Sequence, residues 1–317
     1  MPKIITESEV EEACLEMLEE LGYTILNGPD ISEGGSQEER KYSEVVLTQR
    51  LRAALERINK NLPSEAIEEA VKKIIRQEPN QIVNNQHFHK FVTDGVPVEY
   101  KTKGGIKHDT VWLFDYNNVK NNEFLAVNQF TIIEERNNRR PDIILFANGL
   151  PVVVIELKNP ADEKATIWSA YDQFQTYKEL IPSIFRFNEI LVVSDGLEAR
   201  AGTLTATKER FTPWKAIDGK KVAKPQIEAL TKGMLNKETL LDLIKHFIVF
   251  EVDKDKKEGS VKITKKIAAY HQYHAVNKAV QSTLKATKAD KRAGVVWHTQ
   301  GSGKSLIMAF YAGKLVL

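Results

Sequence analysis

Two acidic residues and a lysine stand at the ends of two neighbouring apolar runs in the middle of the sequence. Asp142 begins the first run, and Glu156 and Lys158 end the second. Two carboxylates held close together repel each other unless a cation neutralises them, and Mg²⁺ binds oxygen ligands while keeping several waters. We therefore interpret Asp142 and Glu156 as ligands of a magnesium ion that promotes phosphodiester hydrolysis. Lys158 would orient the attacking water or offset phosphate charge.

The turn between the two runs decides whether the acids meet. Asn148 and Gly149 are its turn-forming residues. Because side chains alternate between the faces of a strand, a two-residue loop would pair Asp142 with Ile155 and send Glu156 to the opposite face. A three-residue loop with a left-handed glycine would place both acids and the lysine on one face. Catalysis needs that shared face, and the alternative is a turn acid beside an ordinary strand-end ion pair.

A glycine-rich loop lies near the end of the sequence and consists of Gly301, Ser302, Gly303, Lys304 and Ser305. An apolar run expected as a strand at 293–297 precedes it, and an apolar helix expected at 306–316 follows. In a strand, loop and helix of this kind the backbone N–H groups cradle phosphates. Lys304 would then reach the β and γ phosphates of ATP, and Ser305 would bind Mg²⁺. The alternative is a merely flexible turn.

The elements that must position these residues follow from hydrophobic periodicity and turn signals. Helices are expected at residues 10–21, 44–58, 64–79, 162–180, 236–249 and 268–285. Strands are expected at 96–100, 110–114, 124–133, 142–146, 151–158 and 189–193. A turn is expected at 101–107, a polar surface loop at 208–232 and a domain boundary within 253–266. This order predicts an α/β fold whose mixed sheet is covered on both faces.

Composition limits the class of protein. The chain has 317 residues, 42% of them hydrophobic, which is enough to bury a core. Its 45 Lys and Arg residues against 43 Asp and Glu leave a formal charge of +2, so any affinity for DNA must come from local patches. The single cysteine, Cys14, excludes an internal disulfide and is expected to be buried. Without an apolar leader or an 18-residue apolar span, the sequence predicts a soluble, cytoplasmic protein with no membrane contact.

The acidic constellation resembles the active site of the PD-(D/E)xK nuclease superfamily. Asp142, preceded by proline, and Glu156 with Lys158 match its motif on adjacent predicted strands. The resemblance implies that all three are catalytic and that the two acids bind Mg²⁺. Gln173 and Tyr177 in the following predicted helix resemble the QxxxY motif of the RecB-like branch. Because residues four apart share a helix face, both would contact the DNA backbone or brace the site.

Four further residues are candidates for supporting roles. An upstream helical acid often completes such sites, and Glu7 and Glu11 are candidates whose alternative is a solvated helix face. Arg139 and Arg140 would contact phosphate, or form an ordinary solvated pair before Asp142.

The glycine-rich loop resembles motif I of superfamily 2 helicases, a Walker A loop. His298 stands where the usual first glycine would be, at a position that varies in motif I. Gln272 resembles the adenine-recognising glutamine of the Q segment, and a glutamine on a helix surface is the alternative. The resemblance implies ATP binding by Gln272, Gly301, Ser302, Gly303, Lys304 and Ser305. His271 and His274 lack a third ligand at a suitable spacing, so no zinc site is expected.

The order of these two motifs, with the stretches 6–23 and 273–279, resembles the motor (R) subunit of type I restriction enzymes. Residues 1–255 would form a PD-(D/E)xK, RecB-like endonuclease domain with a mixed central sheet flanked by helices. Residues 256–317 would begin the first RecA-like superfamily 2 motor domain. The resemblance implies a type I site-specific deoxyribonuclease that needs Mg²⁺ and, in the full-length subunit, ATP. It would cut double-stranded DNA away from the recognition site, with methyltransferase (M) and specificity (S) subunits as partners.

Two other functions stay open. One is an ATP-driven DNA motor whose nuclease-like domain is only a DNA-binding or docking platform, which the presence of all three motif residues disfavours. The other is a RecB-like repair nuclease-helicase, which the order of the motifs disfavours because here the nuclease precedes the motor. The sequence ends before an acidic Walker B motif, a second RecA-like lobe or an arginine finger, so this chain alone is not expected to translocate DNA.

Overall fold

The computed structural model describes residues 6–76, 78–159, 166–219, 222, 224–254, 261–288 and 291–316. Its strands are β1 (Thr24–Asn27), β2 (Val96–Thr102), β3 (Gly105–Val111), β4 (Phe124–Asn128), β5 (Ile132–Glu134), β6 (Asn137–Arg139), β7 (Ile143–Ala147), β8 (Leu150–Leu157), β9 (Ile190–Ser194), β10 (Ala199–Gly202), β11 (Ile248–Lys254) and β12 (Val261–Ile267). Its helices are α1 (Glu7–Glu20), α2 (Gly28–Ile31), α3 (Thr48–Ile58), α4 (Ser64–Ile75), α5 (Gln81–Asp94), α6 (Ile167–Leu180), α7 (Gln226–Ala229), α8 (Lys237–His246), α9 (Tyr270–Ala286) and α10 (Lys304–Val316).

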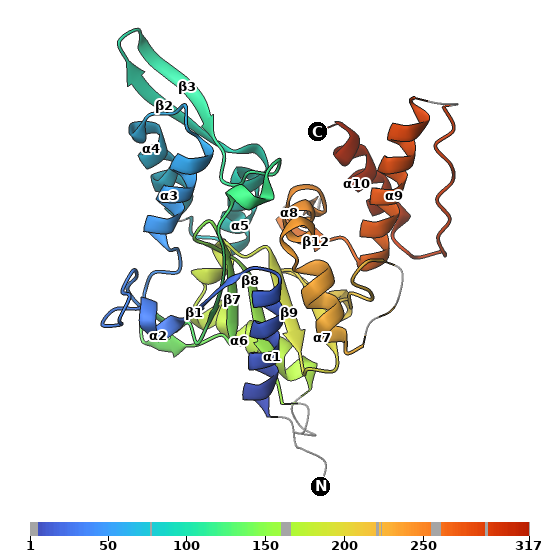
Figure 1. Ribbon diagram of the computed structural model, residues 1–317, viewed down its shortest axis with the longest axis horizontal. Coiled ribbons are helices and arrows are strands. Elements are labelled where there is room, and N and C mark those ends of the chain that lie inside the picture. Colours follow the sequence, from blue (N-terminus) through green and yellow to red (C-terminus); the bar gives the residue numbers. More distant parts are fainter. Residues whose placement is uncertain are drawn as a thin grey trace.

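A six-stranded mixed sheet forms the centre of the molecule, in the order β1-β4-β7-β8-β9-β10 (Figure 1). β1 pairs in parallel with β4, and β8 with β9, while the other neighbours are antiparallel. Every residue of β7, β8 and β9 is buried, which requires cover on both faces of the sheet. The predicted α/β fold with a mixed sheet flanked by helices is confirmed.

Two capped helices contact the strand that carries Glu156. α1 contacts β8 and β1, and α6 contacts β8 and β9. α1 begins with a capping box, in which Glu9 N–H donates to Thr6 Oγ1 (3.3 Å) and Thr6 N–H donates to Glu9 Oε2 (2.9 Å). α6 begins after Thr166, whose hydroxyl accepts from the backbone of the second helical residue at 3.3 Å. Cys14 of α1 is fully buried, as expected.

Several predicted element boundaries are wrong because backbone geometry and tertiary pairing override local patterns. The run expected as one strand at 124–133 is two strands, since Gln129 between β4 and β5 adopts a φ of +54°. The helix expected from residue 44 begins at Thr48, and the one expected to reach residue 249 ends at His246 because β11 begins at Ile248. The helix expected from residue 162 begins at Ile167, and residues 160–165 lie outside the described residues.

Helix α5 was not predicted. Its start nevertheless carries a readable signal, because the Asn80 side chain accepts from the N–H groups of Ile82 and Val83. The segment 208–232, expected as a solvated loop, is anchored by the buried rings of Phe211 and Trp214 and includes α7. Two basic residues of this segment, Lys220 and Lys221, lie outside the described residues.

The segment expected as a domain boundary, 253–266, is largely a paired hairpin. β11 and β12 pair from Ile248 with Ile267 to Lys254 with Val261, and residues 255–260 lie outside the described residues. Lys265 of β12 is fully buried, and its Nζ lies 2.7 Å from Oε2 of the equally buried Glu189. The same ammonium donates to Asn85 Oδ1 at 2.9 Å, and His89 Nδ1 lies 3.0 Å from Glu189 Oε2. A buried ion pair and its hydrogen bonds therefore join the β11–β12 hairpin to α5 and to the residue just before β9.

We expect Lys265→Met to lower the free energy of unfolding by about 3–5 kcal/mol, because it leaves the Glu189 carboxylate buried without its cation. Urea denaturation followed by circular dichroism measures the change. The double variant Lys265→Met/Glu189→Gln should recover most of the loss, since the two residues interact directly. A single-variant loss below about 1 kcal/mol would mean that the pair does not hold the hairpin in place.

Candidate functional site

The turn between β7 and β8 is a two-residue loop. Asn148 and Gly149 form it with φ values of +51° and +78°, as a type I′ hairpin requires. A side chain at Gly149 would also collide with the backbone at the start of α3, because an added Cβ would lie 2.6 Å from Leu47 O and 2.8 Å from Leu51 N. By itself this loop gives the register that was expected to send Asp142 and Glu156 to opposite faces.

A β-bulge in β8 reverses that outcome. Phe146 pairs with Pro151, but Leu145 pairs with Val153, so Val152 is an extra residue on β8. From the bulge to the open end of the hairpin, each residue of β7 is paired one residue further along β8 than the loop alone would give. The acid just before β7 therefore stands opposite the acid near the end of β8. The predicted shared face is formed by a bulge in the strand instead of a longer loop.

Asp142, Glu156 and Lys158 meet at this end of the hairpin. Asp142 Oδ2 accepts from Leu157 N–H at 2.6 Å. Lys158 Nζ lies 3.0 Å from Glu156 Oε1 and donates to the Leu157 carbonyl at 2.8 Å. Glu156 is fully buried, and its Oε2 has no hydrogen-bond partner in the described part of the chain. Burying a carboxylate oxygen without a partner is costly, so this atom marks a place where a ligand fits.

The surroundings of both acids disfavour their charged forms. Burial raises the pKa of Asp142 to about 6, although Leu157 N–H and the Lys158 ammonium oppose the shift. Burial and then the charge of Asp142 raise the pKa of Glu156 well above its usual value. A divalent cation between the two carboxylates would offset their repulsion and the cost of their burial.

Helix α1 brings both upstream acids beside the site. The charges of Glu7 and Glu11 each raise the pKa of Asp142. Glu11 is held by two amides, with Asn128 Nδ2 at 2.8 Å and Gln129 Nε2 at 3.1 Å from its carboxylate oxygens. Gln129 N–H also donates to the Asp142 carbonyl at 3.2 Å. These contacts of Asn128 and Gln129 were not predicted, because glutamine, unlike glycine or asparagine, gives no sequence signal for the positive φ that Gln129 adopts.

Gln173 and Tyr177 share one face of α6, as their spacing predicts. Gln173 Nε2 donates to the Tyr177 hydroxyl at 2.5 Å, and that hydroxyl donates to the Arg140 carbonyl at 3.5 Å. Burial and then the charge of Glu156 raise the pKa of Tyr177. Tyr177 therefore contacts the backbone two residues before Asp142, and Gln173 contacts the Tyr177 hydroxyl. Arg139 donates to a neighbouring carbonyl at 2.8 Å.

The oxygen atoms at this site suit a hard cation. No group of three or more His, Cys, Asp or Glu side chains with metal-binding geometry occurs within the described ranges. An ion here would therefore rely on Asp142 and Glu156, and Mg²⁺ is commonly held by one or two carboxylates with waters completing its octahedron. The unpartnered Oε2 of Glu156 is the atom that such an ion would satisfy.

The glycine-rich loop runs into the start of α10, which begins at Lys304. Gly301 and Gly303 have φ values of +81° and +76°, which glycine adopts without steric cost. Lys304, the first residue of α10, donates through Nζ to the Thr299 carbonyl at 3.0 Å and the His298 carbonyl at 3.4 Å. The lysine is thus folded back over the loop at the N-terminus of a helix, where anions bind favourably.

Gln272 links this loop to the upstream helix α9. It is buried, its Oε1 accepts from Ala269 N–H at 2.9 Å, and its Nε2 donates to the Ser302 carbonyl at 3.2 Å. The alternative of a surface glutamine is therefore wrong. A cavity of about 360 Å³ opens beside the loop, and its walls include Thr205 and Arg210 from the segment after β10. His271 contacts the loop, with Nε2 3.1 Å from the Ser302 carbonyl.

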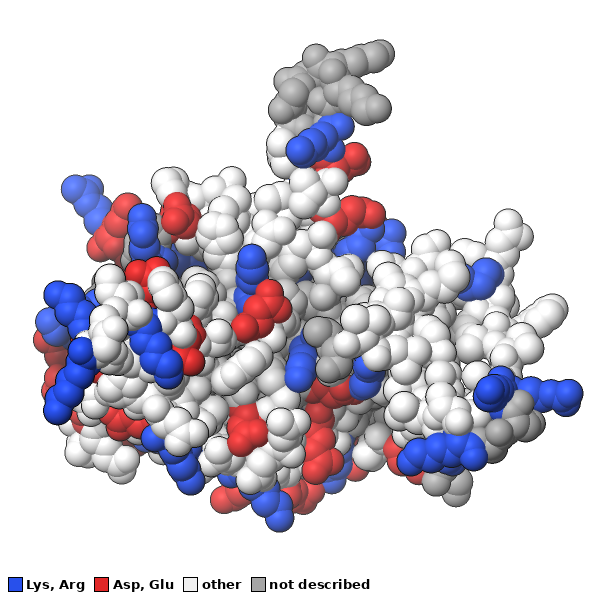
Figure 2. Space-filling view, turned by 90° about the horizontal axis from the view of Figure 1, so that it is seen from above, with Lys and Arg blue, Asp and Glu red and all other residues white. Residues whose placement is uncertain are grey.

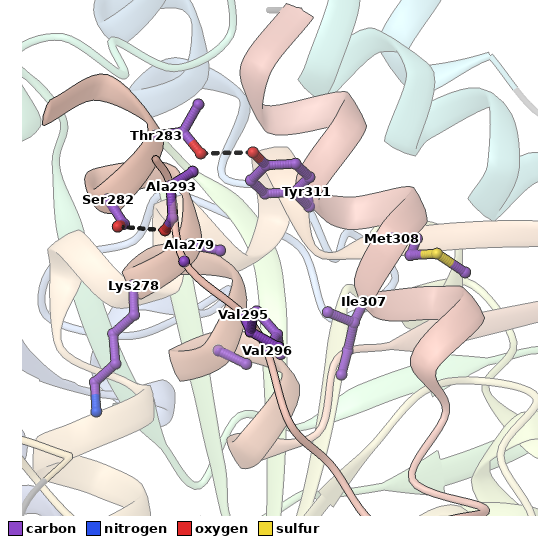
Figure 3. Close-up of a pocket in the computed structure, with 12 residues that line it drawn as sticks. Lys278, Ala279, Ser282, Thr283, Ala293, Val295, Val296, Ile307, Met308 and Tyr311 are labelled. Carbon is purple, nitrogen blue, oxygen red and sulfur yellow. Dashed lines mark hydrogen bonds between the residues drawn. The ribbon is translucent and has the colours of Figure 1, made fainter. Parts of the chain in front are cut away.

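The strand expected at 293–297 is wrong. Described residues 291–299 contain no strand, and Val295 and Trp297 are 91% and 90% exposed. A strand needs a neighbour for its ladder of hydrogen bonds, and none of the described strands lies beside this segment. It instead lines a cavity of about 570 Å³ between α9 and α10, whose walls include Thr283 and Tyr311, joined by a 2.6 Å hydrogen bond between their hydroxyls (Figure 3).

Two family models match the chain. One, described as "Type I restriction enzyme R protein N terminus", matches residues 4–210, which include the acidic site and its supporting helices. The chain belongs to this R protein N-terminus family. The second model, described as "SWI2/SNF2 ATPase", matches residues 271–317, which include α9, the glycine-rich loop and α10.

Curated relatives of this R-protein chain carry related names. The type I restriction enzyme HindI endonuclease subunit of Haemophilus influenzae is 44% identical, over 99% of this chain and 30% of the relative. The putative type I restriction enzyme MjaIXP endonuclease subunit of Methanocaldococcus jannaschii is 32% identical, over 96% of this chain and 31% of the relative. The chain therefore spans about 30% of the length of these relatives. Among the helices described for this R-protein chain, none has the length and apolar composition needed to cross a membrane.

Proposed function

We propose that this chain is the Mg²⁺-dependent endonuclease module of an ATP-dependent type I restriction translocase. The enzyme would be a type I site-specific deoxyribonuclease that cuts double-stranded DNA away from its recognition site. The observation that carries the proposal is the meeting of Asp142 and Glu156 across the bulged hairpin, with Lys158 beside an unpartnered carboxylate oxygen. The names of the relatives, which are endonuclease subunits of type I restriction enzymes, support it.

The residues of the acidic site have complementary roles in this proposal. Asp142 and Glu156 would hold Mg²⁺, which when bound polarises a water and stabilises charge on the phosphodiester. Lys158, held 3.0 Å from Glu156 Oε1, would orient that water or offset charge on the phosphate. Gln173 and Tyr177, which resemble the QxxxY motif of RecB-like PD-(D/E)xK nucleases, would keep the backbone before Asp142 in place.

The second part of the proposal concerns nucleotide binding. Residues 1–255 would be the nuclease domain and 256–317 the start of the first RecA-like superfamily 2 motor domain. The two family matches, to residues 4–210 and 271–317, lie on either side of this proposed division. In the full-length subunit, Gly301, Ser302, Gly303, Lys304 and Ser305 would act as a Walker A loop for ATP and Mg²⁺. Gln272 would read the adenine edge after releasing the Ser302 carbonyl.

The proposed partners are double-stranded DNA and the methyltransferase and specificity subunits of a restriction complex. A RecB-like repair enzyme is less well supported, since the matched nuclease segment precedes the ATPase segment and the relatives carry restriction-enzyme names. If no cleavage is detected, the alternative of a nuclease-like domain that serves only as a DNA-binding or docking platform is favoured.

The test of this function is cleavage of covalently closed circular DNA by the full-length subunit assembled with its methyltransferase and specificity subunits. We expect linear product only when Mg²⁺ and ATP are both present, because cutting needs the metal site and the motor. Chelating the Mg²⁺ should stop product formation, and adding excess Mg²⁺ should restore it. An assembled complex that hydrolyses ATP but leaves the circles intact would refute the nuclease assignment and support the platform.

A further inference from the structure

The β2–β3 hairpin projects from the body of the molecule beyond α4 (Figure 1). Its root is packed, because Val98 and Tyr100 are buried and β2 contacts α4. Beyond the root, all eight residues 101–108 are exposed, including Ile106 at 66%. The turn expected at 101–107 is present but shorter, because strand pairing continues out to Thr102 and Gly105 and leaves only Lys103 and Gly104 in the turn. A two-stranded ribbon without cover on either face is marginally stable on its own, so this tip gains little for the fold.

The tip, defined as residues 101–108, is cationic. It carries Lys101, Lys103, Lys107 and His108 and no acidic residue. Lys107 pairs with Asp109 at 2.8 Å, just below the tip. Lys101 and Lys103 have no ion-pair partner among the residues that the structure describes. The chain as a whole is nearly neutral, so two unpaired lysines on a projecting ribbon form one of the local patches that DNA affinity requires.

The shape of the tip favours duplex DNA over other polyanions. A two-stranded β-ribbon fits the major groove, and lysines at its tip can meet the phosphates on either side. On the face shown in Figure 2, basic and acidic side chains are interspersed at the end of the molecule that carries the hairpin, whereas the end over α9 and α10 is mostly uncharged. We propose that the β2–β3 tip is a DNA-contacting ribbon that binds the duplex backbone away from the acidic site through Lys101 and Lys103. This inference rests on the proposed function, because it takes double-stranded DNA as the partner.

The experiment measures binding of a fluorescent DNA duplex to the full-length subunit by anisotropy, at several salt concentrations and without Mg²⁺. Lys101→Ala/Lys103→Ala should weaken binding and make the slope of log K against log salt less steep by about 1.8. The reason is that each lost phosphate contact contributes about 0.9 to the slope. The control Lys285→Ala/Lys288→Ala removes the same charge from exposed positions at the end of α9 and should keep the wild-type slope. Thermal melts should be unchanged in both variants, since all four lysines are exposed.

The outcomes separate this inference from the proposed function. A tip variant that binds with the wild-type slope overturns the ribbon and leaves the nuclease assignment standing. Equal loss of slope in the tip and control variants also overturns it, because the effect would then be one of net charge. A tip variant that binds DNA normally but no longer assembles with the methyltransferase and specificity subunits would assign the tip to a protein surface and reject the DNA contact. A wild-type subunit without salt-dependent DNA binding would count against the proposed function itself.

Discussion

Glu156→Gln should abolish DNA cleavage by the proposed restriction complex while ATP hydrolysis continues. The substitution keeps the shape of the side chain but removes the charge that faces Asp142 and Lys158 across the bulged hairpin. An amide is a poor ligand for Mg²⁺ beside a single remaining carboxylate, and the Lys158 ammonium loses its ion pair. We expect the rate of linearisation of circular DNA to fall at least about 10³-fold, the scale of losing a group that stabilises charge in the transition state.

Glu198→Gln is the matched control for this variant. Glu198 lies exposed in the turn between β9 and β10, so the same chemical change there should leave cleavage unaltered. ATP hydrolysis is followed in the same reaction, because continued hydrolysis excludes misfolding as the reason for lost cleavage. Removing a buried charge that burial disfavours should also not destabilise the fold. If Glu156→Gln still cleaves DNA, Asp142, Glu156 and Lys158 do not form the nuclease active site.

The β7–β8 hairpin, which brings the two acids together, shows how far strand register can be predicted from a sequence. The Asn148-Gly149 turn was evident from the sequence, and alternation along the strands made the shared face a testable requirement. The bulge at Val152 was not predicted, although Pro151 beside it is a local signal, because proline inside a sheet is found at edge strands, strand starts and bulges. A register argument from turn length alone would have rejected the correct arrangement.

Helices with strong local signals were predicted more reliably than irregular segments. Gln173 and Tyr177 came together because a helical spacing of four fixes their shared face, whatever the sheet beneath does. Gln129 shows the opposite case, since its positive φ and its contact with Glu11 depend on the strands around it. The error at residues 293–297 has a related cause, because an apolar run becomes a strand only beside another strand.

Lys304→Ala should stop ATP hydrolysis by the full-length subunit. The Lys304 ammonium lies over the glycine-rich loop, donating to the Thr299 and His298 carbonyls, at the position from which it would reach the phosphates. Removing a cation from a site where negative charge develops should lower the rate of phosphate release at least about 10²-fold. Lys288→Ala, at an exposed lysine after α9, is the control and should hydrolyse ATP normally. Wild-type hydrolysis by Lys304→Ala would reject the Walker A assignment of this loop.

The same variant decides how the two sites depend on each other. If cutting follows ATP-driven movement along DNA, Lys304→Ala should lose cleavage of circular DNA together with ATP hydrolysis, although Asp142 and Glu156 are untouched. Glu156→Gln, by contrast, should lose cleavage alone. The pair of variants therefore gives an asymmetric pattern that a single combined site could not produce. Cleavage at the wild-type rate by Lys304→Ala would support the nuclease assignment but show that cutting does not depend on ATP hydrolysis. The proposal of an ATP-driven restriction translocase would then be rejected.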